Sequence, residues 1–444
     1  MPASEALRAA LERLLRTWQS ERRLPSVSAA VFRGDEILWQ DALGLARIDD
    51  GTAATPDTQY RVGSITKTFT AVAVMQLRDA GELRLDDTLG QHVEESAHPG
   101  PTIRSMLAHL SGLQREIPGE VWETLTDPTV EELLEQLPQA EMILPPGAYW
   151  HYSNLAYALL GEIVARRSGK PATEYVAERV LAPLGLTRTT WRPAEPAASG
   201  YLVEPYTDTV QAEKPVELKG SAPIGQLWST TGDLAKWGAF LASGDENVLA
   251  NRTREEMHAF QSMVPYVKNW TLGWGLGLEL YRDGNRIYAG HGGAMPGFLA
   301  NLVVAREDGI GAVALANSSA LAYVDSLTLK LAGAAAELSP SPPDEWRVEE
   351  PPPAEVAGIL GNWWGEGVPY VFRWRKGMLE ATLNVPAARV LEPTRFEPDG
   401  TDRYRAISGL ERGELLRVVR MDDGTVEKLY WATYPFTREP RTFG

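Results

Sequence analysis

Ser64 and Lys67, near the start of a predicted helix, have the types and the spacing for nucleophilic catalysis. Positions three apart share a helix face, so the Lys67 amine can approach the Ser64 hydroxyl. The helix dipole and the free backbone N–H groups at a helix N-terminus stabilise developing negative charge. A desolvated lysine loses its proton more readily and can help to activate the hydroxyl. Judged alone, the pattern is common, and Ser64 as a helix cap with Lys67 in water is the better interpretation.

A second pair, Tyr152 and Asn154, lies in an extended stretch before another predicted helix. Residues two apart in extended backbone point the same way. Tyr152 could therefore act as a general base while Asn154 orients an acyl amide or the lysine. The alternative is a loop in which Asn154 caps the helix and the aromatic side chains pack in the core. For this segment alone, that alternative is favoured.

A third group follows a predicted strand that ends at Ala289 and consists of His291, Gly292, Gly293 and Ala294. Two glycines allow a substrate backbone to lie close. The N–H group that follows them can complete an oxyanion hole with the N–H of Ser64. The alternative is a tight strand end with a structural histidine.

Other kinds of active site lack their sequence markers. The chain has no Gly-x-Ser-x-Gly elbow, no HExxH motif, no P-loop and no Gly-x-Gly-x-x-Gly. Its six histidines show no spacing typical of metal ligands. His109 is expected to be structural, because Gly112 is typical of a helix stop. We therefore expect neither a metal nor another cofactor.

Together, and in this order, the three groups resemble motifs of the serine β-lactamase and penicillin-binding-protein superfamily, in particular its class C β-lactamase-like branch. The family's Ser-x-x-Lys, Tyr-x-Asn and Lys/His-x-Gly motifs are matched by Ser64/Lys67, Tyr152/Asn154 and His291/Gly293. The likeness covers about residues 5 to 335. In this family the serine is acylated, and water or another acceptor then releases the acyl group.

The resemblance implies that Ser64 is the nucleophile, Lys67 its activator, and Tyr152 a base and later an acid. Which of Lys67 and Tyr152 takes the first proton is left open. The backbone N–H groups of Ser64 and Ala294 would form the oxyanion hole. The substrate-binding residues implied in this way are Asn154, His291, Gly292, Gly293 and Ala294.

Position 291 departs from the family pattern, because β-lactamases and cell-wall transpeptidases usually have lysine there. A largely neutral imidazole would hold a substrate carboxylate weakly. The resemblance therefore implies a hydrolase of small esters or peptide-like amides, with an esterase slightly favoured. A D-residue-preferring peptidase or amidase and a weak β-lactamase are the alternatives. A catalytically silent binding protein of this fold would lack a catalytic residue, and none is missing.

The elements that must position these groups are predicted from hydrophobic periodicity. Strand-like runs over 26–32 and 36–42 form a hairpin, and a buried helix runs from Ser64 to about Ala80. Residues from about 85 to 200 are helix-rich. Strand character returns over 273–281, 287–289, 299–305 and 311–316. The order predicts an α+β or α/β fold with an inserted all-helical subdomain. The resemblance implies an α+β fold, an α/β sandwich of the β-lactamase/transpeptidase type.

A proline-rich segment predicts a domain boundary. We expect a catalytic domain over 1–338, a semi-rigid linker over 339–354 and a β-domain over 355–444. The last part has short strands and turn signals typical of a small β-barrel, and it loosely resembles a lipocalin-like domain. Its outward-facing charges favour a packing or oligomerisation module over a carrier for an apolar ligand.

Composition limits the partners. The 444 residues include 44% hydrophobic and 23% charged residues, the balance of a globular protein of two or more domains. The net charge of -16 would repel phosphate backbones and anionic headgroups, so neither nucleic acid nor a membrane is an expected partner. Without cysteine, disulfides and thiolate chemistry are excluded. The charged N-terminal stretch resembles neither a signal peptide nor a membrane span, so we expect a cytoplasmic protein. We expect its partners to be a small-molecule substrate and further copies of the same chain in a homo-oligomer.

Overall fold

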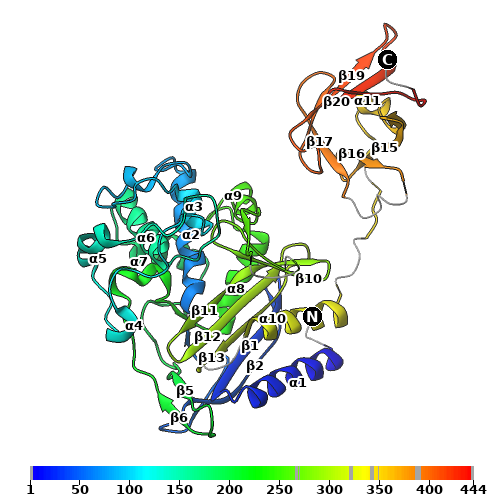
Figure 1. Ribbon diagram of the computed structural model, residues 1–444. Helices are drawn as coiled ribbons and strands as arrows, with labels where there is room; N and C mark the ends of the chain where they lie inside the picture. Colours follow the sequence, from blue (N-terminus) through cyan, green and yellow to red (C-terminus); the bar gives the residue numbers. More distant parts are fainter. Residues whose placement is uncertain are drawn as a thin grey trace. The chain divides into compact units, whose positions relative to one another are not determined.

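The computed structural model describes residues 4–265, 269, 271–319, 324–340, 345–348, 350–385 and 392–441. The chain forms two compact units, Met1–Ser341 and Pro342–Gly444 (Figure 1). Within the described ranges, no helix is long and apolar enough to cross a membrane. The expected boundaries at 338 and 354 and the cytoplasmic location stay predictions.

The first unit is built on a nine-stranded antiparallel sheet with the order β3-β2-β1-β13-β12-β11-β10-β9-β8. Its strands are β1 (Ser26–Arg33), β2 (Glu36–Arg47), β3 (Thr52–Ala53), β8 (Ser262–Met263), β9 (Leu272–Trp274), β10 (Glu279–Asp283), β11 (Arg286–Met295), β12 (Phe298–Ala305) and β13 (Ile310–Ala316). The predicted hairpin is confirmed as β1 and β2. The strand predicted over 273–281 is wrong in one respect, because it is split between β9 and β10. At the break, Gly277 has a φ of +82° and a Cβ there would lie 2.2 Å from Ala71 Cβ.

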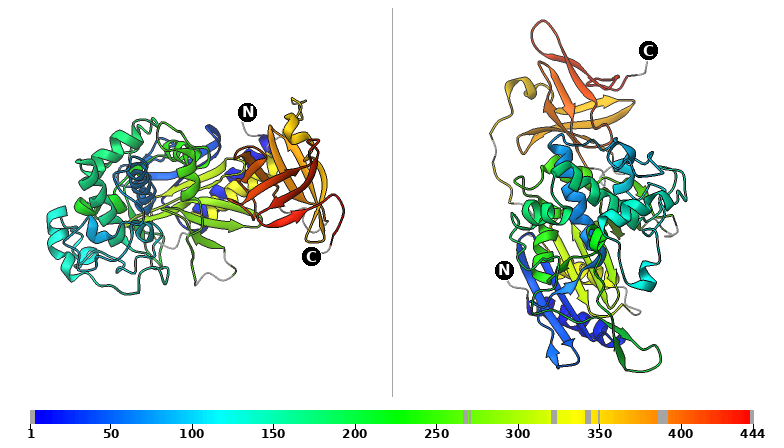
Figure 2. Two further views of the ribbon diagram at one scale, coloured as in Figure 1. Left: turned by 90° about the horizontal axis from the view of Figure 1, so that it is seen from above. Right: turned by 90° about the vertical axis from the view of Figure 1, so that its left-hand side faces the viewer.

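Helices cover both faces of this sheet (Figures 1 and 2). On one face α1 (Glu5–Glu21) and α10 (Val324–Leu338) share a hydrophobic core with Val27, Ala29 and Val31 of β1. The other face packs against α8 (Thr231–Ser243) and the helical region. Because side chains alternate along a strand, β1 contributes to both cores, which makes it a two-sided buried strand.

In chain order, the helical region lies between β3 and β8. It contains η1 (Gly63–Ile65), α2 (Thr66–Asp79), η2 (Leu89–Gln91), α3 (Ile103–Leu107), α4 (Val121–Thr124), α5 (Val130–Gln136), η3 (Leu137–Gln139), α6 (Asn154–Ser168), α7 (Ala172–Val176), η4 (Ala177–Leu181), η5 (Lys219–Ile224) and α9 (Asn251–Met257). Two short antiparallel strand pairs lie in the same part of the chain. They are β4 (Tyr60–Arg61) with β7 (Trp228–Ser229) and β5 (Tyr201–Val203) with β6 (Val210–Ala212). The predicted buried helix is confirmed as η1 followed by α2.

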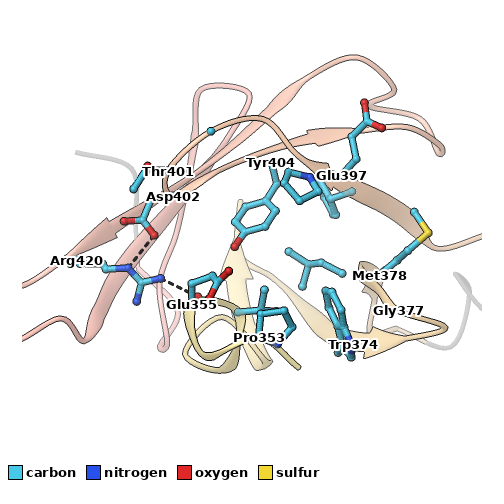
Figure 3. Close-up of a pocket in the computed structure, with 15 residues that line it drawn as sticks. Pro353, Glu355, Trp374, Gly377, Met378, Glu397, Thr401, Asp402, Tyr404 and Arg420 are labelled. Atoms are coloured by element: carbon cyan, nitrogen blue, oxygen red, sulfur yellow. Dashed lines mark hydrogen bonds and ion pairs between the residues drawn. The ribbon is translucent and has the colours of Figure 1, made fainter. Parts of the chain in front are cut away.

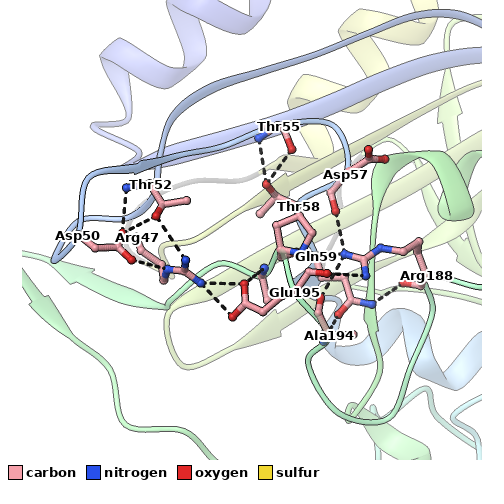
Figure 4. A network of polar contacts seen from close by, with 12 residues as sticks. Arg47, Asp50, Thr52, Thr55, Asp57, Thr58, Gln59, Arg188, Ala194 and Glu195 are labelled. Atoms are coloured by element: carbon pink, nitrogen blue, oxygen red, sulfur yellow. Dashed lines mark hydrogen bonds and ion pairs between the residues drawn. The ribbon is translucent and has the colours of Figure 1, made fainter.

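A polar network anchors the segment that leads to the predicted nucleophile (Figure 4). The Arg188 guanidinium donates to the backbone oxygens of Asp57, Ala194, Glu195 and Pro196 at 3.0–3.1 Å. The Arg47 guanidinium donates to both carboxylate oxygens of Glu195 at 2.9 and 2.8 Å. The loop around residue 195 is thereby fastened to the chain just before β4.

The second unit is an antiparallel barrel of eight strands in sequence order. The elements are α11 (Ala354–Ala357), β14 (Gly361–Gly365), β15 (Val368–Arg375), β16 (Met378–Leu383), β17 (Thr394–Pro398), β18 (Arg403–Ala406), β19 (Leu415–Arg420), β20 (Val426–Trp431) and β21 (Tyr434–Phe436). Backbone hydrogen bonds of 2.8 and 3.0 Å between Trp364 and Thr437 join the first strand to the end of the last, so the barrel is nearly closed. The predicted small β-barrel is confirmed.

Candidate active site

Ser64 and Lys67 lie in direct contact. Ser64 is the middle residue of η1, and Lys67 is the second residue of α2. The Lys67 Nζ lies 3.0 Å from the Ser64 Oγ and donates to the carbonyl oxygen of Ile224 at 2.8 Å. The lysine side chain is wholly buried, with 0% exposure. The alternative in which Lys67 extends into water is therefore wrong.

Burial changes the proton affinity of this lysine. Desolvation is the main cause that lowers the pKa of Lys67 to about 7, and Arg115 lowers it further, while Glu116 and Glu279 act in the opposite direction. The Nζ also lies 5.2 Å from the ring centroid of Tyr152. At neutral pH a large fraction of this amine is uncharged, so it can accept a proton from the Ser64 hydroxyl.

Tyr152 contacts the same serine. Its side chain is hydrogen-bonded to Ser64, and burial raises its pKa above the usual range for tyrosine. The ring stacks on His109, with centroids 4.2 Å apart and planes inclined by 26°. His109 is fully buried and accepts a hydrogen bond from the Ser153 N–H at Nδ1. Tyr152 is thus held as a protonated phenol between Ser64 and an aromatic support.

Asn154 begins α6, and the helix cap is its neighbour. The Ser153 Oγ accepts from the Ala156 N–H at 3.0 Å, so the alternative that Asn154 is the cap is wrong. The Asn154 Nδ2 instead donates to both carboxylate oxygens of Glu116, at 3.0 and 2.9 Å. Its Oδ1 is buried and has no hydrogen-bond partner within the described ranges. Asn154 therefore positions a carboxylate that the sequence analysis missed.

The segment from His291 to Ala294 lies inside β11, which corrects the expectation that the strand ends at Ala289. The ladder continues because Gly292 pairs with Asn301 and Gly293 with Ala300 on β12. A glycine is required at 293, where a Cβ would lie 1.9 Å from the Val62 carbonyl oxygen and 3.2 Å from the Ser64 nitrogen.

The backbone of β11 consequently touches the turn that carries Ser64. A Cβ at Gly63, whose φ is +52°, would lie 2.7 Å from the Ala294 nitrogen. The backbone nitrogens of Ser64 and Ala294 therefore belong to two segments in mutual contact. Two backbone N–H groups in such an arrangement can stabilise an oxyanion.

His291 lies beside this contact and is 1% exposed. Its Nδ1–H donates to the carbonyl oxygen of Gly292, and Nδ1 lies 3.9 Å from a carboxylate oxygen of Glu279. Burial is the main cause that lowers the pKa of His291, and Glu279 opposes it. The imidazole is therefore neutral at pH 7, as the sequence analysis expects. The Nε2 is buried without a hydrogen-bond partner in the described part of the chain.

These groups line one cleft of 1040 Å³. Its wall includes Ser64, Tyr152, Asn154 and His291, with Trp122 and Leu125 as apolar surface. The acidic and basic side chains on the wall are Arg115, Glu116, Glu213 and Glu279. The cleft thus presents more negative than positive side chains. In the described ranges, no group of three or more potential ligand residues could hold a metal ion.

Sequence reasoning missed Glu116 and Glu279. Glu279 accepts from the Gly292 N–H at 2.9 Å and from the hydroxyl of Tyr281. Neither carboxylate lies within a motif, and the only hint was the adjacent charged pair Arg115 and Glu116. Their proximity to Ser64 depends on contacts across the fold.

Residues 7–336 match the family model described as Beta-lactamase, and the chain belongs to this family. Residues 352–438 match a second model, described as a domain of unknown function (DUF7586). The C-terminal barrel is therefore a DUF7586 domain, while the finer likeness to a lipocalin stays a prediction.

Two curated relatives are Penicillin-binding protein 4 of Amycolatopsis lactamdurans and Beta-lactamase-like protein 2 of Dictyostelium discoideum. The first is 30% identical over 374 residues, which cover 79% of this chain and 95% of the relative. The second is 28% identical over 325 residues, which cover 68% of this chain and only 57% of the relative.

Solved structures confirm the β-lactamase/transpeptidase-like α+β fold. The octameric penicillin-binding protein homologue from Pyrococcus abyssi has a TM-score of 0.68 at 23% identity, over 97% of this chain and 99% of the other. The D-amino acid amidase from Ochrobactrum anthropi SV3 has a TM-score of 0.66 at 25% identity, over 76% of this chain and 100% of the other.

Proposed function

We propose that this chain is a serine hydrolase that forms an acyl-enzyme on Ser64, and that its substrates are small amino-acid amides and esters with a free amino group. The observation that carries the proposal is the contact of the buried Lys67 with Ser64, which together with Tyr152 lines a predominantly acidic cleft. Lys67 supplies a base and Tyr152 an acid to the same hydroxyl.

The opposite pKa shifts support Lys67 as the group that takes the first proton. The neutral amine accepts the Ser64 proton while Oγ bonds to the carbonyl carbon and the carbonyl electrons move to oxygen. The N–H groups of Ser64 and Ala294 stabilise that oxyanion. When the intermediate collapses, Tyr152 protonates the leaving group and recovers a proton from Lys67. Water then attacks the acyl carbon by the reverse proton route and releases the acid and the free serine.

The charges of the cleft support the substrate class. Glu279 attracts an ammonium group and repels a carboxylate, and the neutral His291 offers a carboxylate no full charge. Glu116 adds less to this field, because Arg115 Nε lies 3.3 Å from one of its carboxylate oxygens. Compounds with an amine on the acyl side should therefore bind better than penicillins. The sequence analysis favours esters narrowly over amides. The acidic cleft and the likeness to a D-amino acid amidase support extending the substrates to amino-acid amides of D configuration.

A paired substrate panel tests the proposal. Phenylalanine amide and phenylalanine methyl ester, each as D and L forms, are compared with N-acetyl-phenylalanine amide, p-nitrophenyl acetate and penicillin. We expect the highest kcat/KM for D forms with a free amine and slow or absent acylation by penicillin. Equal rates for free and N-acetylated amides would contradict the assigned substrate class.

Intact-mass measurement tests the nucleophile. A fluorophosphonate should add one label to the protein and none to Ser64→Ala, while Ser168→Ala at the end of α6 should label normally. Labelling of folded Ser64→Ala at another residue would refute the assignment.

We also propose that copies of the chain associate. A homologue of the same fold is described as octameric, and light scattering over a concentration series measures the state of this chain. A strict monomer at every concentration would refute this part.

A further inference from the structure

His109 accepts hydrogen bonds from the residues on both sides of Tyr152. The His151 N–H donates to its carbonyl oxygen at 2.8 Å, and the Ser153 N–H donates to its Nδ1 at 3.0 Å. Its ring also stacks on the Tyr152 ring, with the centroids 4.2 Å apart. A single residue, distant in the chain, therefore contacts the backbone before Tyr152, the backbone after it and the aromatic ring itself.

The backbone of His109 has a conformation that few residues adopt. Its φ is +55°, in the left-handed region, although the residue is not glycine. Histidine occurs in this region more often than most residues do. Such strained positions cluster at functional sites, where the surrounding structure maintains them. In this conformation, just after α3, the residue presents both its carbonyl oxygen and its ring to the segment 151–153.

The imidazole ring of His109 is fixed and uncharged. It is 0% exposed, and Tyr157 and Trp274 pack against it with ring centroids 5.0 and 4.7 Å away. Because a backbone N–H only donates, Nδ1 must accept, and the proton of the neutral ring lies on Nε2. Burial lowers the pKa of His109 well below its usual value, and the nearby Lys67 lowers it further. The ring therefore remains a neutral acceptor at neutral pH.

We propose that His109 is a positioning residue, whose two hydrogen bonds and ring contact hold the Tyr152 phenol where it can protonate the leaving group. The inference rests on the acyl-enzyme mechanism proposed for Ser64, in which Tyr152 is the acid. A proton donor acts only within hydrogen-bond reach of the leaving atom, and a displacement of about 1 Å can reduce the rate about a hundredfold. His109 then has a role in the reaction beyond the structural one expected from the sequence.

The nature of the leaving group separates a positioning role from a purely structural one. An alcohol leaves from the intermediate with the help of a proton donor, whereas p-nitrophenolate leaves readily as an anion. The measured quantity is kcat/KM, which reports acylation, for the methyl ester divided by kcat/KM for the p-nitrophenyl ester. Both esters carry the acyl group that the native protein cleaves fastest. Because the acyl group is the same, this leaving-group ratio reports proton donation.

Two variants each remove one part of the contact. His109→Phe keeps a ring beside Tyr152 and loses the acceptor for the Ser153 N–H. His109→Asn keeps an acceptor and tolerates the left-handed backbone, but it loses the ring. We expect each change to lower the leaving-group ratio roughly tenfold. In a Tyr152→Phe background the same changes should alter the ratio less than about twofold, because the hydroxyl that His109 positions is absent.

Two controls lose hydrogen bonds elsewhere in the chain. Arg420→Met in the C-terminal barrel removes the bonds that Arg420 donates to the Asp402 carboxylate at 2.8 Å and to the Glu355 carbonyl oxygen at 2.7 Å (Figure 3). His258→Phe in the first unit loses the bond that Nε2 donates to the Leu241 carbonyl oxygen at 3.0 Å. Both controls should unfold at a lower temperature and leave the leaving-group ratio unchanged.

Fluorophosphonate labelling of every variant counts the folded sites and tests the underlying mechanism separately. Fluoride leaves without a proton donor, so both His109 variants should label Ser64 at a near-native rate per folded molecule. Failure of the native protein to label would refute the acyl-enzyme mechanism itself. Normal labelling with an unchanged leaving-group ratio in both variants, or an equal loss of the ratio with and without the Tyr152 hydroxyl, would overturn the positioning role alone.

Discussion

Lys67 and Tyr152 flank the Ser64 hydroxyl, and the same burial shifts their pKa values in opposite directions. Removal from water disfavours the charged form of each group, which is the ammonium of Lys67 and the phenolate of Tyr152. At neutral pH one group is therefore ready to accept a proton and the other to donate one. This difference between two residues is the basis of the following two predictions.

The first prediction concerns pH. Because the pKa of Lys67 is lowered to about 7, the protonated, inactive amine accumulates as the pH falls below that value. We expect kcat/KM for a neutral ester to fall about tenfold per pH unit well below pH 7 and to level off above it. A pH–rate series from 5 to 9 measures this. Lys67→Met should lose activity throughout the range, and an unchanged acid limb in a residually active Lys67→Met protein would assign the titration to another group.

The second prediction concerns the Tyr152 hydroxyl. Tyr152→Phe keeps the ring that stacks on His109 and removes only the proton donor. We expect kcat to fall by on the order of 10²–10⁴, with a small change in KM. Steady-state kinetics on an unactivated amide provide the measurement. Near-normal kcat would mean that Tyr152 only forms part of the cleft wall.

The third prediction concerns His291 and carboxylate-bearing substrates. His291→Lys should improve acylation by penicillins relative to neutral esters, by roughly 1–3 kcal/mol where the geometry permits. Glu279, 3.9 Å from the imidazole, would pair with the new lysine and reduce the gain. The ratio of kcat/KM values for the two substrate classes should therefore increase further in the double variant with Glu279→Gln. A ratio that neither variant changes would remove the argument from position 291.

At the scale of elements, the site depends on the contact between η1 and β11. The turn carrying Ser64 approaches the strand so closely that glycine is required on both sides, at Gly63 and Gly293. This contact brings the backbone nitrogens of Ser64 and Ala294 into neighbouring segments. The proposed oxyanion site is thus a property of two elements rather than of one motif.

The fourth prediction tests that contact. A Cβ at 293 would lie 1.9 Å from the Val62 carbonyl oxygen, so Gly293→Ala must displace η1 from β11. We expect kcat to fall by on the order of 10²–10³, the cost of losing one oxyanion donor, together with a lower Tm. Gly333→Ala on α10, where a Cβ meets nothing within 4 Å, is the control and should retain activity. Full kcat in Gly293→Ala would show that the donors lie elsewhere.

At the scale of the whole molecule, the apolar residues form separate cores. Two hydrophobic clusters contain only residues of the first unit, and the third contains only barrel residues from Val356 to Phe436. A unit with its own core has the means to fold alone. The connecting segment is rich in proline, which limits its conformational freedom.

The fifth prediction follows from these separate cores. A chain of residues 1–338 should fold alone, unfold in one cooperative transition and still label at Ser64. A second chain ending at 341 keeps the Ser339 carbonyl that accepts from Arg33 and should be slightly more stable. Thermal unfolding and fluorophosphonate labelling of both chains are the measurements. Aggregation of both would show that the two units share one core.

The sequence alone determined the features that depend on neighbouring residues. The buried helix after Ser64 and the β1–β2 hairpin follow from periodicity and local turn geometry. The spacing of Ser64 and Lys67 alone favoured a lysine in water, and only the three motifs together indicated their contact. The three motifs together also indicated the family. Each of these signals lies within a short stretch of chain, where spacing translates directly into geometry.

Only the tertiary structure decided the charge and the proton affinities of the cleft. Asn154 donates a hydrogen bond to Glu116 at the cleft, and the Gly292 N–H donates one to Glu279. The two residues of each pair are distant in sequence. The pKa of Lys67 depends on how completely those elements exclude water, and the continuation of β11 through the glycines depends on its partner β12. Desolvation and strand pairing arise from the assembled surroundings of a residue, and no local spacing encodes them.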